Sequence, residues 1–364
     1  MRRLIYIFII GLLLCSYTWA DGSRYASKSL LSEGKWVKIR VDKTGIYKLS
    51  YADLKNMGFS DPSKVSVHGY GGWPLDEDFS KEYIDDVPST PVWRGSDYLL
   101  FYGKGPVKWE YDSSSQTFVH TNNPYSLYGY YFVTDATPTN DMTSVAQASG
   151  ATNRITTYDD YLVHEQELVS LAKSGRELYG EDFSGATPRT LSTFSSIPGI
   201  TNEDAKVTMS FVSKVTSGTG VASLSINQSN VLDVSIRSNR EEYVKALEGV
   251  STAVWKGEKS EKNSVVVSYN SASHNNVRLN YVRLHFKRTL QPYGAYTFFR
   301  SIASIGNVSR FVVQGANANT LVFDVTDAQR VRLMETELNG SELTFSIPAG
   351  TLREFVLVRT DQSF

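Results

Sequence analysis

The chain has 364 residues, a length that corresponds to two or three domains. Apolar residues make up 41% of it and charged residues 21%, a composition that excludes disordered and collagen-like chains. The 37 basic and 38 acidic residues nearly cancel, so the net charge gives no reason to expect nucleic acid or an anionic membrane surface as a partner.

Residues 1–20 have the pattern of a secretory signal peptide. Arg2 and Arg3 precede an apolar run over residues 4–14, which is too short to span a bilayer comfortably but suits the core of a signal. Small residues at Thr18 and Ala20 form a cleavage site, so we expect export with cleavage after Ala20. No other apolar run approaches 18 residues, so no transmembrane segment is predicted.

Cys15 is the one cysteine of the sequence, and it lies inside the signal peptide. Cleavage would remove Arg2, Arg3 and no acidic residue, which leaves a chain of net charge −3 without any cysteine. Disulfides, thiolate nucleophiles and cysteine-ligated metals are therefore excluded from residues 21–364.

The first half of the chain predicts strands with one short helix. Ser50 stands before the helix expected over residues 51–57, and Gly58 ends it. In the strand over residues 64–70, Val65 and Val67 should face inward and Ser66 and His68 outward. Residues 156–183 allow a helix, but Gly175 and Gly180 favour a strand followed by a long loop. The other strands expected here cover residues 35–41, 46–49, 98–102, 108–111, 116–120 and 129–134, with turn-rich segments at 68–74 and 101–106.

The second half predicts an antiparallel β-sandwich. In its longest strand, residues 277–288, the apolar positions change phase, which indicates a bulge near Tyr281. The other expected strands cover residues 190–197, 206–215, 222–227, 231–236, 252–255 and 264–269, followed by a block at 310–314, 320–325, 331–335, 343–347 and 353–358.

The fold class is therefore all-β, with antiparallel sandwich-type domains and one short helix near the N-terminus. We expect a signal peptide over residues 1–20, a β-rich domain over 21–185, a β-sandwich over 186–290 and a C-terminal β block over 291–364.

No catalytic template fits the sequence, which lacks a G-x-S-x-G elbow, a phosphate-binding P-loop and a dinucleotide-binding glycine motif after a strand. His164-Glu165 begins a zinc-protease helix motif, but Leu168 stands where the second histidine is required. The other four histidines have no ligand spacing. We therefore predict no catalytic, cofactor-binding or metal-ligating residue.

Two clusters leave alternatives open. The acidic residues Asp76, Glu77, Asp78, Glu82, Asp85 and Asp86 suit either a solvated loop or, less readily, a calcium site, since the EF-hand spacing is absent. Trp36, Trp73, Trp93 and Trp109 suit either the core of the first domain, which is favoured, or an exposed platform for sugars or peptides.

Several stretches resemble the N-terminal region of the type IX secretion system sortases, gingipain-like cysteine peptidases of the Bacteroidetes surface. The resemblance is carried by residues 34–49, 53–59, 67–73 (VHGYGGW), 99–106 (LLFYGKGP), 164–165, 174–183 and 323–327. It implies an outer-membrane cell-surface location. It also implies, as partners, cargo proteins with C-terminal sorting domains and other secretion components, with cargo cleaved and attached to lipopolysaccharide.

In that family the nucleophile and base lie in a peptidase domain downstream of the resembling region, so no catalytic residue carries over to this sequence. The resemblance implies that this chain is the non-catalytic region of such an enzyme, with the block over 291–364 leading into a missing peptidase domain. The alternative is an independent exported β-sandwich module that binds a glycan or protein and has no enzymatic activity.

Overall fold

The computed structural model describes residues 25–78, 80–81, 84–173, 175–271 and 274–364. The expected signal peptide, its cleavage site and Cys15 lie outside these residues.

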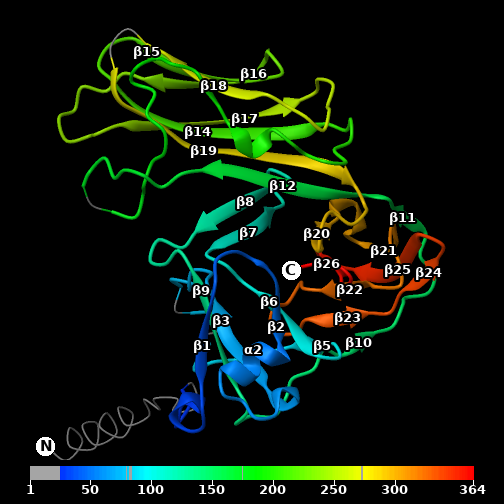
Figure 1. Cartoon of the computed structure of the whole chain (residues 1–364). Coiled ribbons are helices and arrows are strands. Elements are labelled where there is room, and N and C mark those ends of the chain that lie inside the picture. The colour runs from blue at the N-terminus through cyan, green and yellow to red at the C-terminus, as the bar shows by residue number, and fades with distance from the viewer. Residues whose placement is uncertain (1–24, 79, 82–83, 174, 272–273) are drawn as a thin grey trace, which may run out of the picture.

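A nine-stranded sheet forms the centre of the molecule (Figure 1). In order, its strands are β10 (Ser144–Val145), β23 (Arg332–Met334), β22 (Thr320–Asp324), β26 (Glu354–Arg359), β20 (Tyr296–Arg300), β12 (Thr157–Glu165), β19 (His274–Thr289), β14 (Ala205–Val215) and β17 (Leu247–Trp255).

One end of the central sheet belongs to a β-sandwich, drawn at the top of Figure 1. Alternating residues of β14 and β19 pack an apolar core against a second sheet. Phe211, fully buried, stacks on Tyr269 with ring centroids 5.4 Å apart. The second sheet has the strand order β13 (Arg189–Thr190), β18 (Val265–Asn270), β15 (Thr219–Ile226) and β16 (Ser229–Arg237).

The expected bulge is present in β19. Tyr281 pairs with Ser210 and Leu279 pairs with Phe211, so Asn280 is the extra residue. This extra residue changes the parity of the strand, which explains why apolar residues occupy opposite phases before and after it.

The other end of the central sheet is covered on both faces. On β26, Phe355 and Leu357 face one apolar core, while Val356 and Val358 face another. The first core lies against a four-stranded sheet of order β11 (Asn153–Ile155), β21 (Asn307–Val313), β25 (Glu342–Ala349) and β24 (Glu337–Asn339). The pairs β11–β21 and β10–β23 are parallel, whereas the other strand pairs of the described sheets are antiparallel.

The N-terminal part, blue to cyan in Figure 1, supplies the second cover. Leu100 and Tyr102 of β6 pack against β22 and β26. The strands of this part form a four-stranded sheet, β1 (Val37–Val41), β9 (Gly129–Thr134), β3 (Ser66–Gly71) and β4 (Ser89–Thr90), a three-stranded sheet, β2 (Gly45–Ser50), β6 (Tyr98–Gly103) and β5 (Val92–Arg94), and a hairpin, β7 (Val107–Asp112) and β8 (Thr117–Asn122).

Among the described residues, α2 (Tyr51–Asn56) is the one α-helix, as expected. The Ser50 hydroxyl accepts a hydrogen bond from the Asp53 amide at 3.0 Å, which caps the helix start. The all-β fold class is thereby confirmed. The three-part division of residues 21–364 stays a prediction, and the central sheet takes strands from all three parts.

Two local predictions were wrong. Residues 190–197 do not form a strand but the end of β13, a 3-10 helix, η4 (Ser192–Phe194), and an isolated bridge at Ser196, and Phe194 packs in the sandwich core. Ser66 and His68 do not face outward but are buried, since residues 36 and 137 cover that face of β3. The His68 ring bonds to the Thr137 hydroxyl at 2.8 Å and meets Trp36 edge-on.

Candidate functional site

Two glycine- and aromatic-rich segments, one at the end of β3 (residues 70–73) and one at the end of β6 (residues 103–106), contact each other at Lys104. The Gly72 amide donates to the Lys104 carbonyl at 2.8 Å, and the Lys104 amide donates to the Tyr131 hydroxyl at 2.8 Å. The Asn123 side chain donates to the Gly72 carbonyl at 2.8 Å and ties in the segment that follows β8. We call this assembly of residues 70–73, 103–106 and 129 the cleft floor.

Glycine is required in the cleft floor because backbones approach one another closely. Gly71 has φ 87°, and a Cβ there would lie 2.7 Å from the Lys104 Cβ. A Cβ on Gly72 would lie 2.8 Å from the Gly129 Cα. A Cβ on Gly129 would clash with the Lys104 carbonyl oxygen. The turn-rich appearance of these segments in the sequence therefore reflects packing as well as chain reversal.

Lys104 is 5% exposed, yet its ammonium group has aromatic rings in place of a carboxylate. Its Nζ lies 4.3 Å from the centroid of the Tyr70 ring and 4.8 Å from that of Trp73. No hydrogen bond or ion pair joins this Nζ to another described residue, and the charges that act on it from farther away are those of Asp327 and Lys108. Burial lowers the pKa of Lys104 to about 8, since the charged form is the one that desolvation disfavours.

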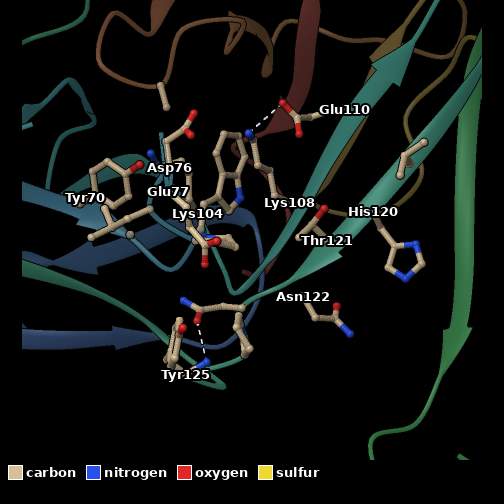
Figure 2. A pocket seen from close by; sticks show the side chains of 18 of the residues that line it. Tyr70, Asp76, Glu77, Lys104, Lys108, Glu110, His120, Thr121, Asn122 and Tyr125 are labelled. Carbon is tan, nitrogen blue, oxygen red and sulfur yellow. Dashed lines mark hydrogen bonds and ion pairs between the residues drawn. The ribbon is translucent and has the colours of Figure 1, made fainter. Parts of the chain in front are cut away.

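Lys104 lines a large open cleft of about 1760 Å³. Figure 2 shows Tyr70, Asp76, Glu77 and Lys104 gathered on one side of it, and His120 and Asn122 on the other. The second wall comes from β8, from the end of β12 and from the bulge region of β19, so it joins the hairpin to the central sheet.

The second wall of the cleft is acidic. The His120 Nε2 donates to Glu165 at 2.8 Å, and the Asn122 amide donates to Glu165 at 2.7 Å and to Glu167 at 3.0 Å. The His120 Nδ1 is buried and has no hydrogen-bond partner among the described residues. Partial burial and the neighbouring carboxylates Glu248, Glu165 and Glu167 raise the pKa of Glu177.

Carboxylates outnumber cations around the cleft by eight to four. Lys108 pairs with Glu110 at 2.8 Å, and Arg176 pairs with Glu77, so these two cations are already neutralised. The acidic residues that line the cleft are Asp76, Glu77, Asp86, Glu110, Glu165, Glu167, Glu177 and Asp327, and the basic ones are Lys104, Lys108, Arg176 and Arg283.

Trp73 also lines a second pocket, of about 640 Å³. Trp109 lines it and stacks on Tyr161 with centroids 4.0 Å apart. Beneath them the fully buried Arg300 lies 4.3 Å from the Tyr161 ring and donates to Glu354 at 2.7 Å. The Trp109–Tyr161 stack joins the hairpin to the central sheet, whereas the Arg300–Glu354 ion pair lies within that sheet, between β20 and β26.

Neither the four tryptophans nor the acidic cluster matches one of its two sequence-based alternatives completely. Trp36, Trp73, Trp93 and Trp109 are all half-buried, so they form neither a fully buried core nor an exposed platform. In the acidic cluster, Asp76, Glu77 and Asp86 line the cleft, and Lys81 pairs with Asp76 at 2.6 Å. No group of three or more metal-ligating side chains occurs within the described ranges.

The remaining histidines all have local partners. His164 is buried and bonds to Glu181 at 2.6 Å. His285 is half-buried under the hairpin and bonds to the buried Asp159 at 3.0 Å. His274 bonds to the Ser271 carbonyl at 2.9 Å. Sequence reasoning missed Lys104, Glu177 and Tyr281 as cleft residues, although the GYGGW and YGKGP segments around Lys104 were visible.

No helix among the described residues is long and apolar enough to cross a membrane. The fold and the cleft define an all-β, multi-sheet region with a large open cleft among the described residues.

The fold matches that of PorU. Dimeric latent PorU from Porphyromonas gingivalis superimposes with a TM-score of 0.87 and 30% sequence identity over 93% of this chain. The chain spans 33% of the length of that protein, so it has the structure of one PorU region. The resemblance seen in the sequence is thereby confirmed. No family profile and no curated protein matches the sequence.

Two further solved structures share much less. BuGH86 in complex with neoagarooctaose matches with a TM-score of 0.19 and 11% identity over 70% of this chain and 32% of its own. A cycloisomaltooligosaccharide glucanotransferase of Paenibacillus sp. matches with a TM-score of 0.16 and 8% identity over 60% of this chain and 47% of its own. At these scores neither likeness bears on the fold or on the ligand.

Proposed function

We propose that this chain is the non-catalytic region of a type IX secretion sortase. The observation that supports it most is the shared fold with PorU over nearly the whole chain. In this proposal the chain is exported by a cleaved signal peptide, reaches the outer-membrane cell surface and contributes to holding cargo proteins or other secretion components.

The chemistry of a cysteine peptidase supports a non-catalytic role. Such an enzyme forms its acyl intermediate on a thiolate, activated by an imidazole. Residues 21–364 contain no cysteine, and the described histidines bond to carboxylates, hydroxyls or carbonyls that hold them within the fold. Any thiolate for this reaction therefore has to come from outside residues 21–364.

The test uses the purified chain and a cargo protein with and without its C-terminal sorting domain. We expect the chain to leave the cargo uncleaved and to bind the cargo that carries the sorting domain, as measured by biolayer interferometry. Cleavage that persists after removal of contaminating proteases would overturn the non-catalytic role. Equal binding to cargo without the sorting domain would overturn the cargo role.

The second candidate function is a glycan-binding module. Trp73 lines both pockets, and the half-buried Trp109 offers an aromatic ring beside the second one. Binding on a glycan array that is lost in Trp109→Ala but kept in the matched control Trp93→Ala would favour this candidate. Trp93 is equally half-buried but lines neither pocket.

A further inference from the structure

Lys104 is a buried cation that forms no ion pair with a described carboxylate, and the Asp327 carboxylate across the cleft attracts it only as a more distant charge. The π faces of Tyr70 and Trp73 attract the Lys104 ammonium. These rings carry no net negative charge, so they do not fully replace the hydration that the ammonium loses on burial. The Trp73 Nε1 is a second buried donor without a partner. Lys104 lines the cleft, so its ammonium is the donor beside the cleft that an entering acceptor could pair with.

The cleft floor holds this arrangement in place before any ligand binds. The Lys104 backbone is fixed at both its amide and its carbonyl, by Tyr131 and Gly72. At Gly71, Gly72 and Gly129 the neighbouring backbones lie so close that an added Cβ would clash with them, so this part of the floor is closely packed. A preorganised group loses little conformational entropy when it binds, so the energy of an ion pair here would appear mostly as affinity.

The surrounding charges define the ligand that suits Lys104. Lys108 and Arg176 already have carboxylate partners, so one ligand carboxylate would satisfy the remaining unpaired charge on this side. A dianionic phosphate would be repelled by the carboxylates, which outnumber the cations around the cleft. That excess, concentrated at Glu165, Glu167 and Glu177, instead favours cationic groups on the rest of the ligand.

We propose that the cleft binds a basic peptide segment through one carboxylate, which forms an ion pair with Lys104 while cationic side chains face the acidic wall of β8 and β12. The carboxylate belongs either to a peptide C-terminus or to an Asp or Glu side chain. This inference goes beyond the proposed function, because it holds for whichever protein the chain serves.

The test compares three synthetic peptides by isothermal titration with the purified chain. The first is acetyl-Arg-Gly-Arg-Gly with a free C-terminus, the second is its C-terminal amide, and the third is an amide with Glu in place of the last Gly. We expect at least one of the two carboxylate peptides to bind about tenfold or more tightly than the uncharged amide, since a hydrogen bond to a charged group contributes at least that much. Whichever carboxylate peptide binds identifies the source of the carboxylate.

The same binding should be visible at Lys104 itself. NMR titration of its Nζ should show the pKa of Lys104, about 8 in the free protein, rising when the carboxylate peptide binds. Lys104→Met should weaken binding about tenfold or more, and the control Lys64→Met, at an exposed lysine outside the cleft, should change it about twofold at most. If Lys104→Met fails to fold, the shift of the Lys104 pKa in the unaltered protein still decides the question.

Three results would overturn the inference. The first is equal binding of all three peptides, and the second is carboxylate binding that leaves the pKa of Lys104 unmoved. The third is displacement of the peptide by inorganic phosphate at equal concentration, which would mean a general anion site.

Discussion

The β-sandwich packs large side chains against one another, whereas the cleft floor packs backbone against backbone. In the sandwich, the buried side chains of Phe183, Phe211 and Tyr269 pack together in the core between the two sheets. In the cleft floor the glycines have no side chains, so the backbones approach one another closely around a buried cation, Lys104. The first arrangement gives stability, and the second gives a shaped surface at some cost to stability.

The largest expected effect tests the sandwich side of this comparison. Phe211 is fully buried between Phe183 and Tyr269, so Phe211→Ala should lower the free energy of unfolding by about 3–5 kcal/mol. Urea denaturation followed by circular dichroism measures the change. A loss below about 1 kcal/mol would mean that the sandwich core is loosely packed.

A somewhat smaller loss is expected when a side chain is added to the cleft floor. The new Cβ of Gly129→Ala would meet the Lys104 carbonyl, and backbone yields less readily than a side chain. We expect a loss of about 3 kcal/mol, at the upper end of overpacking effects. Gly350→Ala is the matched control, because no atom lies within 4 Å of its Cβ position, and it should unfold like the unaltered protein.

The charge on Lys104 should appear in the pH dependence of stability. Burial lowers the pKa of Lys104 from 10.5 to about 8, so between these values the unfolded chain keeps a proton that the folded protein releases. The contribution of Lys104 to the free energy of unfolding therefore rises with pH across this window, by about 3 kcal/mol.

Lys104→Met should lack that rise, while Lys64→Met, at an exposed lysine, should retain it. Urea denaturation at pH 7.5 and pH 10.5 on all three proteins measures the difference. Identical pH profiles for Lys104→Met and the unaltered protein would show that the Lys104 ammonium is solvated. The cleft floor would then hold no buried charge to distinguish it from the β-sandwich.

The smallest effect is expected on the outer face of the sandwich. Val250 on β17 is 53% exposed, so its methyl groups add little to the core. Val250→Thr should change the free energy of unfolding by about 0.5 kcal/mol or less, as measured by urea denaturation. A much larger loss would indicate that another surface covers β17 in solution.

The sequence predicts regular strands well because their two-residue alternation depends on local side chains alone. The bulge at Tyr281 was predictable for the same reason, since an extra residue shifts the alternation. Residues 190–197 were misjudged because the direction of Phe194 depends on a core formed by distant strands. Ser66 and His68 were misjudged because alternation does not show that residues 36 and 137 cover the second face of β3.

The candidate site was less predictable than the fold. The sequence shows the GYGGW and YGKGP segments but not that they meet, and their meeting gives Lys104 its burial. Glu165 and Tyr281 join the opposite wall through pairing between β12 and β19, whose partners lie more than 100 residues apart. Lysine is usually a surface residue, so composition gives no reason to single out Lys104.

The order of strands in the central sheet also sets how the chain folds. The strand β26, at Glu354–Arg359, lies between β20 and β22 and joins the sandwich half of the sheet to the β10–β23 edge. The sheet therefore cannot become continuous until residue 359 is available, however early the N-terminal strands emerge. Strand pairs this distant in sequence close slowly, so we expect folding in milliseconds to seconds or longer rather than microseconds. During that interval the unpaired edges of β20 and β22 are exposed to any chain nearby, and a chaperone that binds extended segments would have its targets there.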